Sequence, residues 1–199
     1  FFDFCILLIW YTMIVKGRIL FKYILECRDM VEYFSSNVFL RGKVCKMLNR
    51  IFMVMSNGRT VSNGTYRLVL AQNKNYAISV DHNRKTPGTN LLLWSNSNIA
   101  FRRFQFTYQN NGYYTIKNEG SGLYLSVKGQ GSASGSNVEL SSSATLWQVL
   151  PDGTGSYYLV PKCSSTSCLD LYSGVPANGK NIEIWNYNMG KAQRWSLVK

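Results

Sequence analysis

The residues best suited to chemistry lie on two short stretches near the end of the chain. In "CLDLY", Asp170 alternates with leucines, and in "NIEIWN", Glu183 and Trp185 alternate with isoleucines. Because successive side chains of a strand point to opposite faces, burial of the leucines and isoleucines turns these three residues outward. A neutral sugar is held by a carboxylate that accepts from two hydroxyls and by an exposed ring beneath its C–H face. The pattern therefore predicts a sugar-binding pocket here.

The same residues raise the question of catalysis. Asp170 and Glu183 are the pair of carboxylates that would merit testing as a glycosidase dyad. Nothing in the sequence indicates the deep cleft that such a site needs, so hydrolysis by this chain is not expected. The single histidine, His82, lies in a loop beside Arg84 and Lys85 and supplies neither a zinc cluster nor a Ser/His/Asp triad. The sequence favours binding without catalysis, cofactor or metal.

The cysteines leave one structural question open. The chain has five, an odd number. Cys163 and Cys168 flank the loop "SSTS" between two strand-like runs, and the ends of a hairpin come close enough to be bridged. A disulfide between them and a pair of free thiols are both compatible with the pattern.

Residues 1–60 differ in pattern from the rest of the chain. The run "FFDFCILLIWYTMIV" is shorter than the roughly 20 residues that span a bilayer. Lys16 and Arg18 follow this run, whereas a secretory signal carries its positive charge before it. By the positive-inside rule such a segment would leave the rest of the chain in the cytoplasm. Membrane contact of residues 1–20 therefore stays open.

The remainder of this region, to residue 60, is compatible with one or two amphipathic helices or with a segment that does not fold on its own. The chain begins with Phe1 rather than Met, which is consistent with a missing upstream piece. We assign no function to residues 1–60.

From residue 61 onward the apolar period is two, and Gly, Asn and Ser clusters separate short alternating runs. This pattern predicts an all-β domain over residues 61–199. The twelve expected strands are 65–70, 76–80, 91–95, 104–109, 113–118, 123–127, 137–141, 146–150, 157–162, 168–172, 181–186 and 193–198.

These strands fall into three similar units. Each unit has a loop that ends in "GTN", "GSN" or "GKN" and a last strand that carries a large aromatic residue, Phe104, Trp147 or Trp195. The units cover about residues 62–108, 109–151 and 152–199. A unit of four short strands cannot bury its own apolar face, so we expect the three to pack around an axis with these aromatics in the core.

Residues 62–199 resemble the ricin B-chain-like lectins, carbohydrate-binding β-trefoils with QxW repeats that occur as modules of secreted toxins and glycosidases. The three motifs here read Arg102-Arg103-Phe104, Thr145-Leu146-Trp147 and Gln193-Arg194-Trp195, so QxW is intact only in the third unit. The resemblance implies a β-trefoil of three four-stranded repeats, with a six-stranded barrel capped by three hairpins. It also implies up to three shallow sugar pockets, glycan partners, and a secreted or cell-surface location.

The family pattern assigns roles in the third repeat. Asp170 would bind sugar hydroxyls, Trp185 would stack on the ring, and Gln193 would complete the pocket, with Asn186 or Asn188 as loop contacts. Glu183 faces out beside them. Ala192 stands where galactose-binding relatives have Asn, so galactose is not the expected ligand.

The other two repeats are weaker candidates. In the first, Trp94 matches Trp185, but Ser79 and Leu92 replace the two carboxylates. Asp81 would reach the pocket only if its strand shifted. Arg102 replaces Gln193, which favours an acidic ligand.

The second repeat has Ser126 in place of the Asp and Ser141 in place of the stacking aromatic. Glu139 alone cannot hold a sugar, so we expect a structural role for this repeat.

The net charge of +12 supports an alternative. A basic β-trefoil could bind polyanions with steep salt dependence, or contact a protein partner without a sugar site. Specific nucleic-acid recognition is not expected. Shallow sugar pockets predict dissociation constants on the order of tens of micromolar to millimolar. Such a domain would gain avidity from repeated glycans, or would target an upstream catalytic domain to glycans.

Overall fold

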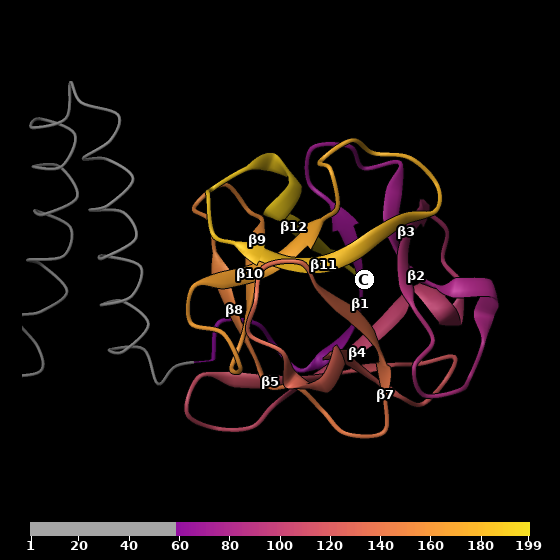
Figure 1. The fold of residues 1–199 in the computed structure, drawn as a ribbon, viewed down its shortest axis with the longest axis horizontal. Coiled ribbons are helices and arrows are strands. Elements are labelled where there is room, and N and C mark those ends of the chain that lie inside the picture. Colours follow the sequence, from indigo (N-terminus) through magenta and orange to yellow (C-terminus); the bar gives the residue numbers. More distant parts are fainter. Residues whose placement is uncertain (1–58) are drawn as a thin grey trace, which may run out of the picture. The chain divides into compact units, whose positions relative to one another are not determined.

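The computed structural model describes residues 59–199, which form twelve strands and four short 3₁₀ turns (Figure 1). The expectations for residues 1–58, including membrane contact and helices, lie outside the described residues. Within residues 59–199, no helix has the length and apolarity needed to cross a bilayer. The strands are β1 (Gly64–Leu70), β2 (Tyr76–Val80), β3 (Leu91–Ser95), β4 (Arg103–Tyr108), β5 (Tyr113–Asn118), β6 (Tyr124–Val127), β7 (Ser136–Ser141), β8 (Trp147–Pro151), β9 (Tyr157–Pro161), β10 (Ser167–Leu171), β11 (Lys180–Asn186) and β12 (Trp195–Val198).

Six of the strands close into a ring of antiparallel neighbours. β1 pairs with β4, β4 with β5, β5 with β8, β8 with β9, β9 with β12, and β12 returns to β1. Every repeat supplies its first and last strand to this barrel. Closure removes the free sheet edges that would otherwise expose unpaired backbone groups.

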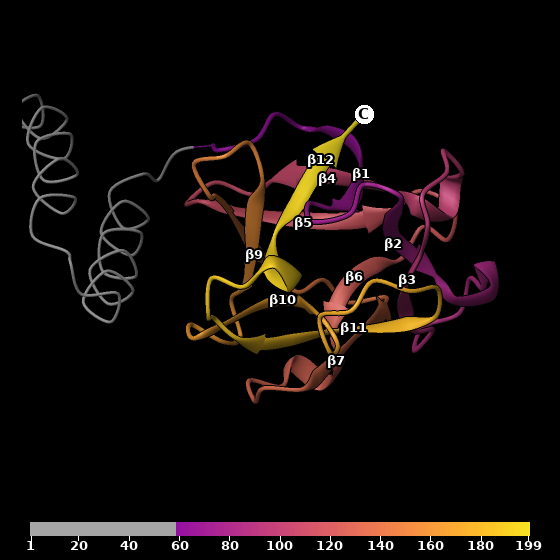
Figure 2. The ribbon, with the colours of Figure 1, turned by 90° about the horizontal axis from the view of Figure 1, so that it is seen from above.

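The other six strands form three hairpins, β2–β3, β6–β7 and β10–β11. β11 pairs with both β3 and β7, and a bridge between Asn90 and Glu139 links the remaining two hairpins. Figure 2 shows the hairpin strands β7, β10 and β11 on one side of the domain and the barrel strands β1, β4 and β5 on the opposite side. The predicted all-β, β-trefoil-like fold is therefore confirmed.

One large aromatic residue from the last strand of each repeat is buried in the core, as expected. Phe104, Trp147 and Trp195 are all fully buried. Nε1 of Trp147 donates to the carbonyl of Leu125 at 3.0 Å, and Nε1 of Trp195 donates to the carbonyl of Leu169 at 3.2 Å. Each indole thus joins the end of its repeat to the second strand of the same repeat.

The described part of the chain enters the barrel through a short anchored segment. The Tyr114 hydroxyl accepts from the amide of Val61 at 2.8 Å and donates to the carbonyl of the same residue at 2.9 Å. Thr60 Oγ1 donates to the carbonyl of Val149 at 2.6 Å. Residues ahead of β1 therefore belong to the folded domain and connect β5 to β8.

Cys163 and Cys168 do not form a disulfide in the structure. Cys163 and Cys168 are both free thiols. Cys168 is buried on β10 opposite Trp185, whereas the Cys163 thiol donates to the carbonyl of Gly131 at 3.5 Å. Of the two alternatives that the sequence left open, the structure shows the pair of free thiols.

We expect the central aromatics to dominate stability. Trp147→Ala should lower the free energy of unfolding by about 3–5 kcal/mol, because it opens a cavity and leaves the Leu125 carbonyl without its donor. Trp147→Phe should cost about 1–2 kcal/mol, since Phe104 fills the same position in the first repeat. Urea unfolding measures both. A loss below about 1 kcal/mol for the alanine variant would contradict this assignment.

Candidate functional site

The outward faces of the three hairpins have the same register. Three cross-strand pairs occupy equivalent positions: Ser79 with Leu92, Ser126 with Glu139, and Asp170 with Glu183. Two residues farther along, the equivalent positions hold Trp94, Ser141 and Trp185. The three hairpins therefore share one backbone arrangement on their outward faces but carry different side chains there.

The loop of one repeat packs against the aromatic position of another. Gly88, Gly135 and Gly179 have φ angles of 84°, 85° and 81°, a conformation that glycine adopts without strain. They donate to the carbonyls of Leu140, Ile184 and Leu93 at 2.7, 2.8 and 2.9 Å, each the residue before the aromatic position.

Two of these glycines lie against an indole. A Cβ atom on Gly135 would lie 3.6 Å from Trp185, and one on Gly179 would lie 3.9 Å from Trp94. Opposite Ser141, a Cβ on Gly88 would meet nothing within 4 Å. The backbone supports for an aromatic residue are present in all three repeats, but the ring is present in two.

In the third repeat, Trp185 projects into solvent with 43% of its surface exposed. The two carboxylates beside it do not, since Asp170 and Glu183 are each only 7% exposed. The expectation that they face solvent is wrong, although they do point away from the core. The reason is tertiary: the turn η4 (Lys191–Gln193) packs against β10, and β7 pairs with β11 at Glu183.

Gln193 holds the loop that follows β11 in the third repeat. The side chain is fully buried, its Nε2 donates to the carbonyl of Asn186 at 3.0 Å, and its Oε1 accepts from the amide of Asn188 at 3.0 Å. Asn188 in turn accepts at Oδ1 from the amide of Gly190 at 2.7 Å. Gln193 therefore holds the loop after β11 in place, and Asn186 and Asn188 are joined to it through their backbones.

Burial of the two carboxylates of the third repeat changes their pKa values. Burial raises the pKa of Asp170 from its ordinary 3.8 to about 6, and a hydrogen bond from Gln193 opposes part of that rise. Burial also raises the pKa of Glu183, and the charge of Asp170 adds to this effect. Among the described residues, no Lys or Arg lies within salt-bridge distance of Asp170. A strongly perturbed carboxylate without such a partner, as Asp170 is, is typical of a functional site.

The first repeat contains a concave pocket of 280 Å³. The buried Ser79 and Trp94, which is 41% exposed, both line it. The lining residues are Ser79, Val80, Asp81, His82, Asn83, Leu92, Trp94 and Arg102.

Asp81 reaches this pocket without any shift of its strand. β2 keeps its register with β3, and Asp81 enters through the turn η1 (Asp81–Asn83) that follows β2. His82 and Asn83 adopt φ angles of 48° and 55° in this turn. Sequence reasoning missed this contribution. The polar run "DHN" directly after an apolar strand was the available signal, because such residues tolerate left-handed backbone.

The second repeat has replaced the site with a closed polar network. Ser126 Oγ accepts from the amide of Thr145 at 3.0 Å and donates to the carbonyl of Ser143 at 2.7 Å. Thr145 Oγ1 accepts from the amide of Val127 at 3.0 Å and from Gln130 at 2.7 Å. Both side chains are committed to internal hydrogen bonds, and no ring stands at Ser141.

The profile of the family described as "Ricin-type beta-trefoil lectin domain-like" matches residues 49–141, 100–185 and 143–199. No curated protein matches the chain. The structure resembles the designed threefold-symmetric protein ThreeFoil, with a TM-score of 0.65, 27% identity and coverage of 69% of this chain and 99% of ThreeFoil.

Two natural proteins show the same fold. The ricin B-like lectin of Macrolepiota procera, solved in complex with lactose, has a TM-score of 0.62 and 15% identity over 71% of this chain and 99% of the lectin. An exo-β-1,3-galactanase from Clostridium thermocellum has a TM-score of 0.62 and 22% identity over 71% of this chain but 31% of the enzyme.

The raised pKa of Asp170 predicts a stabilising substitution. Because the folded protein binds this proton more tightly than the unfolded chain, stability should fall as pH rises from about 4 to about 6. Asp170→Asn removes this penalty and should raise the free energy of unfolding at pH 7 by up to about 3 kcal/mol. Thermal unfolding of both proteins between pH 4 and pH 7 tests this. The same pH dependence in the variant and the parent would refute the assignment.

Proposed function

The chain belongs to the ricin-type β-trefoil lectin domain family, and we propose that it binds carbohydrate without catalysis, chiefly at the third repeat. The observation that carries the proposal is an exposed indole, Trp185, on the same hairpin face as a buried and destabilising carboxylate, Asp170. A structural role explains neither feature, because exposing the ring and burying the charge both oppose folding.

The geometry suits a pyranose ring. The indole of Trp185 offers a flat apolar surface to the C–H face of the sugar. Asp170 is mostly ionised at neutral pH, given a pKa of about 6, and can accept from two hydroxyls. Its low exposure is compatible with contact, since Ser79 at the equivalent position lines the first-repeat pocket although it is buried. Gln193 acts as a positioning residue in this proposal, and Glu183 supplies a second acceptor.

The relatives support the ligand class and a wider role. The lactose complex of the Macrolepiota procera lectin supports a neutral sugar as ligand. In the galactanase, this fold matches about a third of an enzyme chain, which supports a role as one module of a larger protein. We propose that such a module would target the larger protein to glycans. A solitary shallow site predicts weak binding, on the order of −4 to −6 kcal/mol, so repeated glycans would raise the apparent affinity.

A glycan array with the full chain tests the proposal, followed by isothermal titration with the best neutral ligand. Trp185→Ala and Asp170→Asn should each weaken binding at least about tenfold, because one removes the stacking surface and the other the charged acceptor. Val198→Ala, which shortens an exposed apolar side chain on β12, serves as the control and should bind as the parent does.

Two outcomes would refute this proposal. One is retention of glycan binding in both site variants combined with its loss in moderate salt, which indicates nonspecific attraction of a polyanion to the basic surface. The other is release of reducing ends from the bound glycan by the parent protein but not by Asp170→Asn, which indicates hydrolysis by the carboxylate pair.

Binding in the third repeat should also depend on pH. Protonation of Asp170 removes the charge that strengthens its hydrogen bonds to sugar hydroxyls, so affinity should fall as pH decreases through about 6. Titrations at pH 7.5 and pH 5 measure the change. Equal affinity at both values would show that the Asp170 carboxylate does not contact the ligand.

A further inference from the structure

The first-repeat pocket differs from the third in charge rather than in architecture. The turn η2 (Ala100–Arg102) packs against β2 as η4 packs against β10, so Arg102 and Gln193 both end a turn beside a hairpin. Ser79 and Leu92 replace the two buried carboxylates of the third repeat. The first repeat therefore has an exposed indole, Trp94, at the position of Trp185, and a cation, Arg102, at the position of Gln193.

Arg102 is not neutralised by the protein. Its Nη1 donates to Ser97 Oγ, while its Nε is buried and has no hydrogen-bond partner. No carboxylate of residues 59–199 lies within salt-bridge distance of it. Partial burial lowers the pKa of Arg102, which agrees with an incompletely compensated charge. A buried donor without a partner is costly and calls for an explanation.

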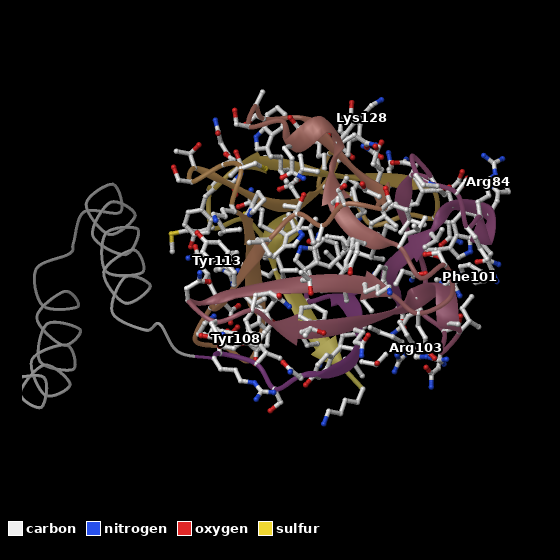
Figure 3. All side chains as sticks on the ribbon, turned by 90° about the horizontal axis from the view of Figure 1, so that it is seen from below. Arg84, Phe101, Arg103, Tyr108, Tyr113 and Lys128 are labelled. Atoms are coloured by element: carbon white, nitrogen blue, oxygen red, sulfur yellow. The ribbon has the colours of Figure 1, made fainter. Side chains whose placement is uncertain are left out.

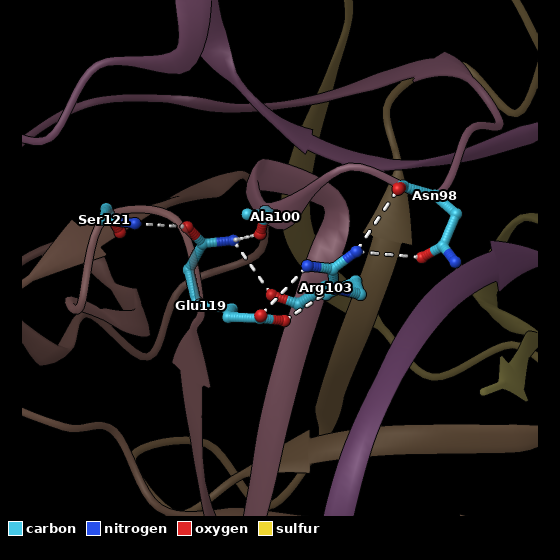
Figure 4. A network of polar contacts seen from close by, with 6 residues as sticks. Asn98, Ala100, Arg103, Glu119 and Ser121 are labelled. Atoms are coloured by element: carbon cyan, nitrogen blue, oxygen red, sulfur yellow. Dashed lines mark hydrogen bonds and ion pairs between the residues drawn. The ribbon is translucent and has the colours of Figure 1, made fainter.

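The neighbouring Arg103, which does not line the pocket, has a fully compensated charge. Its Nε and Nη2 donate to the two carboxylate oxygens of Glu119 at 2.6 and 2.9 Å. Its Nη1 donates to the backbone and side-chain oxygens of Asn98 (Figure 4). Arg103 is thus committed to the protein, whereas Arg102, which lines the pocket, keeps a guanidinium nitrogen without a partner.

The other titratable groups of the pocket do not fill this role. Asp81 accepts at Oδ1 from Nδ1 of His82 at 2.7 Å, and the imidazole itself is largely exposed. Farther out, Lys85 lies over the ring of Phe101 at 5.8 Å. Arg84, Phe101 and Arg103 mark the same end of the domain (Figure 3). Within residues 59–199, Oδ2 of Asp81 makes no hydrogen bond to the protein, so this oxygen can accept from a hydroxyl.

We propose that the first-repeat pocket binds a sugar that carries a carboxylate, with Arg102 pairing the carboxylate and Trp94 lying beneath the ring. This inference rests on the proposed function and specifies a second ligand class for the same surface. A guanidinium carries a positive charge and can donate two parallel hydrogen bonds to a planar carboxylate. A neutral amide such as that of Gln193 cannot form this charged, bidentate pair. Asp81 accepts from a ring hydroxyl in this arrangement. The volume of 280 Å³ admits a single hexuronic acid unit.

One domain would then hold a neutral and an acidic sugar in two pockets of the same topology. A heteropolysaccharide that contains both kinds of unit would engage the two pockets together and gain avidity over either sugar alone.

The test uses the full chain and three monosaccharide probes: methyl β-D-glucuronide, methyl β-D-glucoside and methyl β-D-glucoside 6-sulfate. Arg102→Gln and Arg103→Gln form a matched pair, since both remove one positive charge from adjacent positions. We expect Arg102→Gln to weaken glucuronide binding about tenfold or more and Arg103→Gln to change it less than about twofold. Titration by NMR chemical shift measures all affinities, and thermal unfolding confirms that each variant is folded.

Further variants locate the site. Arg102→Lys keeps the charge without the planar fork and should give an intermediate affinity. Trp94→Ala should abolish glucuronide binding, whereas Trp185→Ala should leave it unchanged and remove only glucoside binding. Loss of glucoside binding alone thus reports on the third repeat and separates failure of the proposed function from failure of this inference.

Three results would overturn the inference. Equal losses in the two arginine variants would mean that only net charge matters. Loss of glucuronide binding in Trp185→Ala would place the acidic sugar in the third repeat. Equal affinity for the 6-sulfate would show that the pocket selects an anion and not a carboxylate.

Discussion

Burial of one large aromatic residue per repeat is the constraint on which the remaining structure depends. Phe104, Trp147 and Trp195 can all be buried only if the three repeats share one core, and the closed ring of six strands provides it. Once the inward face of every hairpin is fixed, its outward face is fixed as well, because side chains alternate along a strand. The location of the candidate sites is thus a consequence of core packing.

This arrangement lets the three outward faces diverge without disturbing the core. The glycine hydrogen bonds at Gly88, Gly135 and Gly179 are kept in all three repeats, although the residue they support is serine in one and tryptophan in two. Equivalent positions on the hairpins hold Ser79, Ser126 and Asp170, and all are buried. In the second repeat, the polar side chains are hydrogen-bonded to one another and to the backbone. The third repeat has a carboxylate without an ionic partner, and the first has a guanidinium without one. Of the three outward faces, that of the second repeat is closed by internal hydrogen bonds, that of the third is acidic and that of the first is basic.

The two candidate sites share a physical signature. In the third repeat the carboxylate of Asp170 is buried, and in the first repeat the Nε atom of Arg102 is buried. Neither group has an ionic partner among the described residues, and each repeat has an exposed indole on the same face. Both features oppose folding, so they are better explained by a ligand than by stability. The paired arginine and glutamate at positions 103 and 119 show that this surface can also compensate charge fully.

Local pattern was sufficient for much of this protein. Alternation and turn residues located the twelve strands, and the repeated aromatic endings identified the core and the packing of three units around an axis. The resemblance to the ricin B-chain-like lectins supplied the β-trefoil. Alternation also identified the exposed positions of Trp94 and Trp185, since strand alternation is a property of the backbone itself.

Burial and pairing on the outward faces were decided only by tertiary contacts. Asp170 and Glu183 are covered because η4 and β7 pack against their hairpin, Gln193 is committed to the following loop, and Asp81 enters a pocket through a left-handed turn. Cys163 and Cys168 remain apart for the same kind of reason, because each has its own neighbours. The sequence determined which side of each strand faces the core, a local matter of period. Only the tertiary structure decided which outward-facing side chains are exposed to solvent and which are buried, because segments distant in the chain cover some of them.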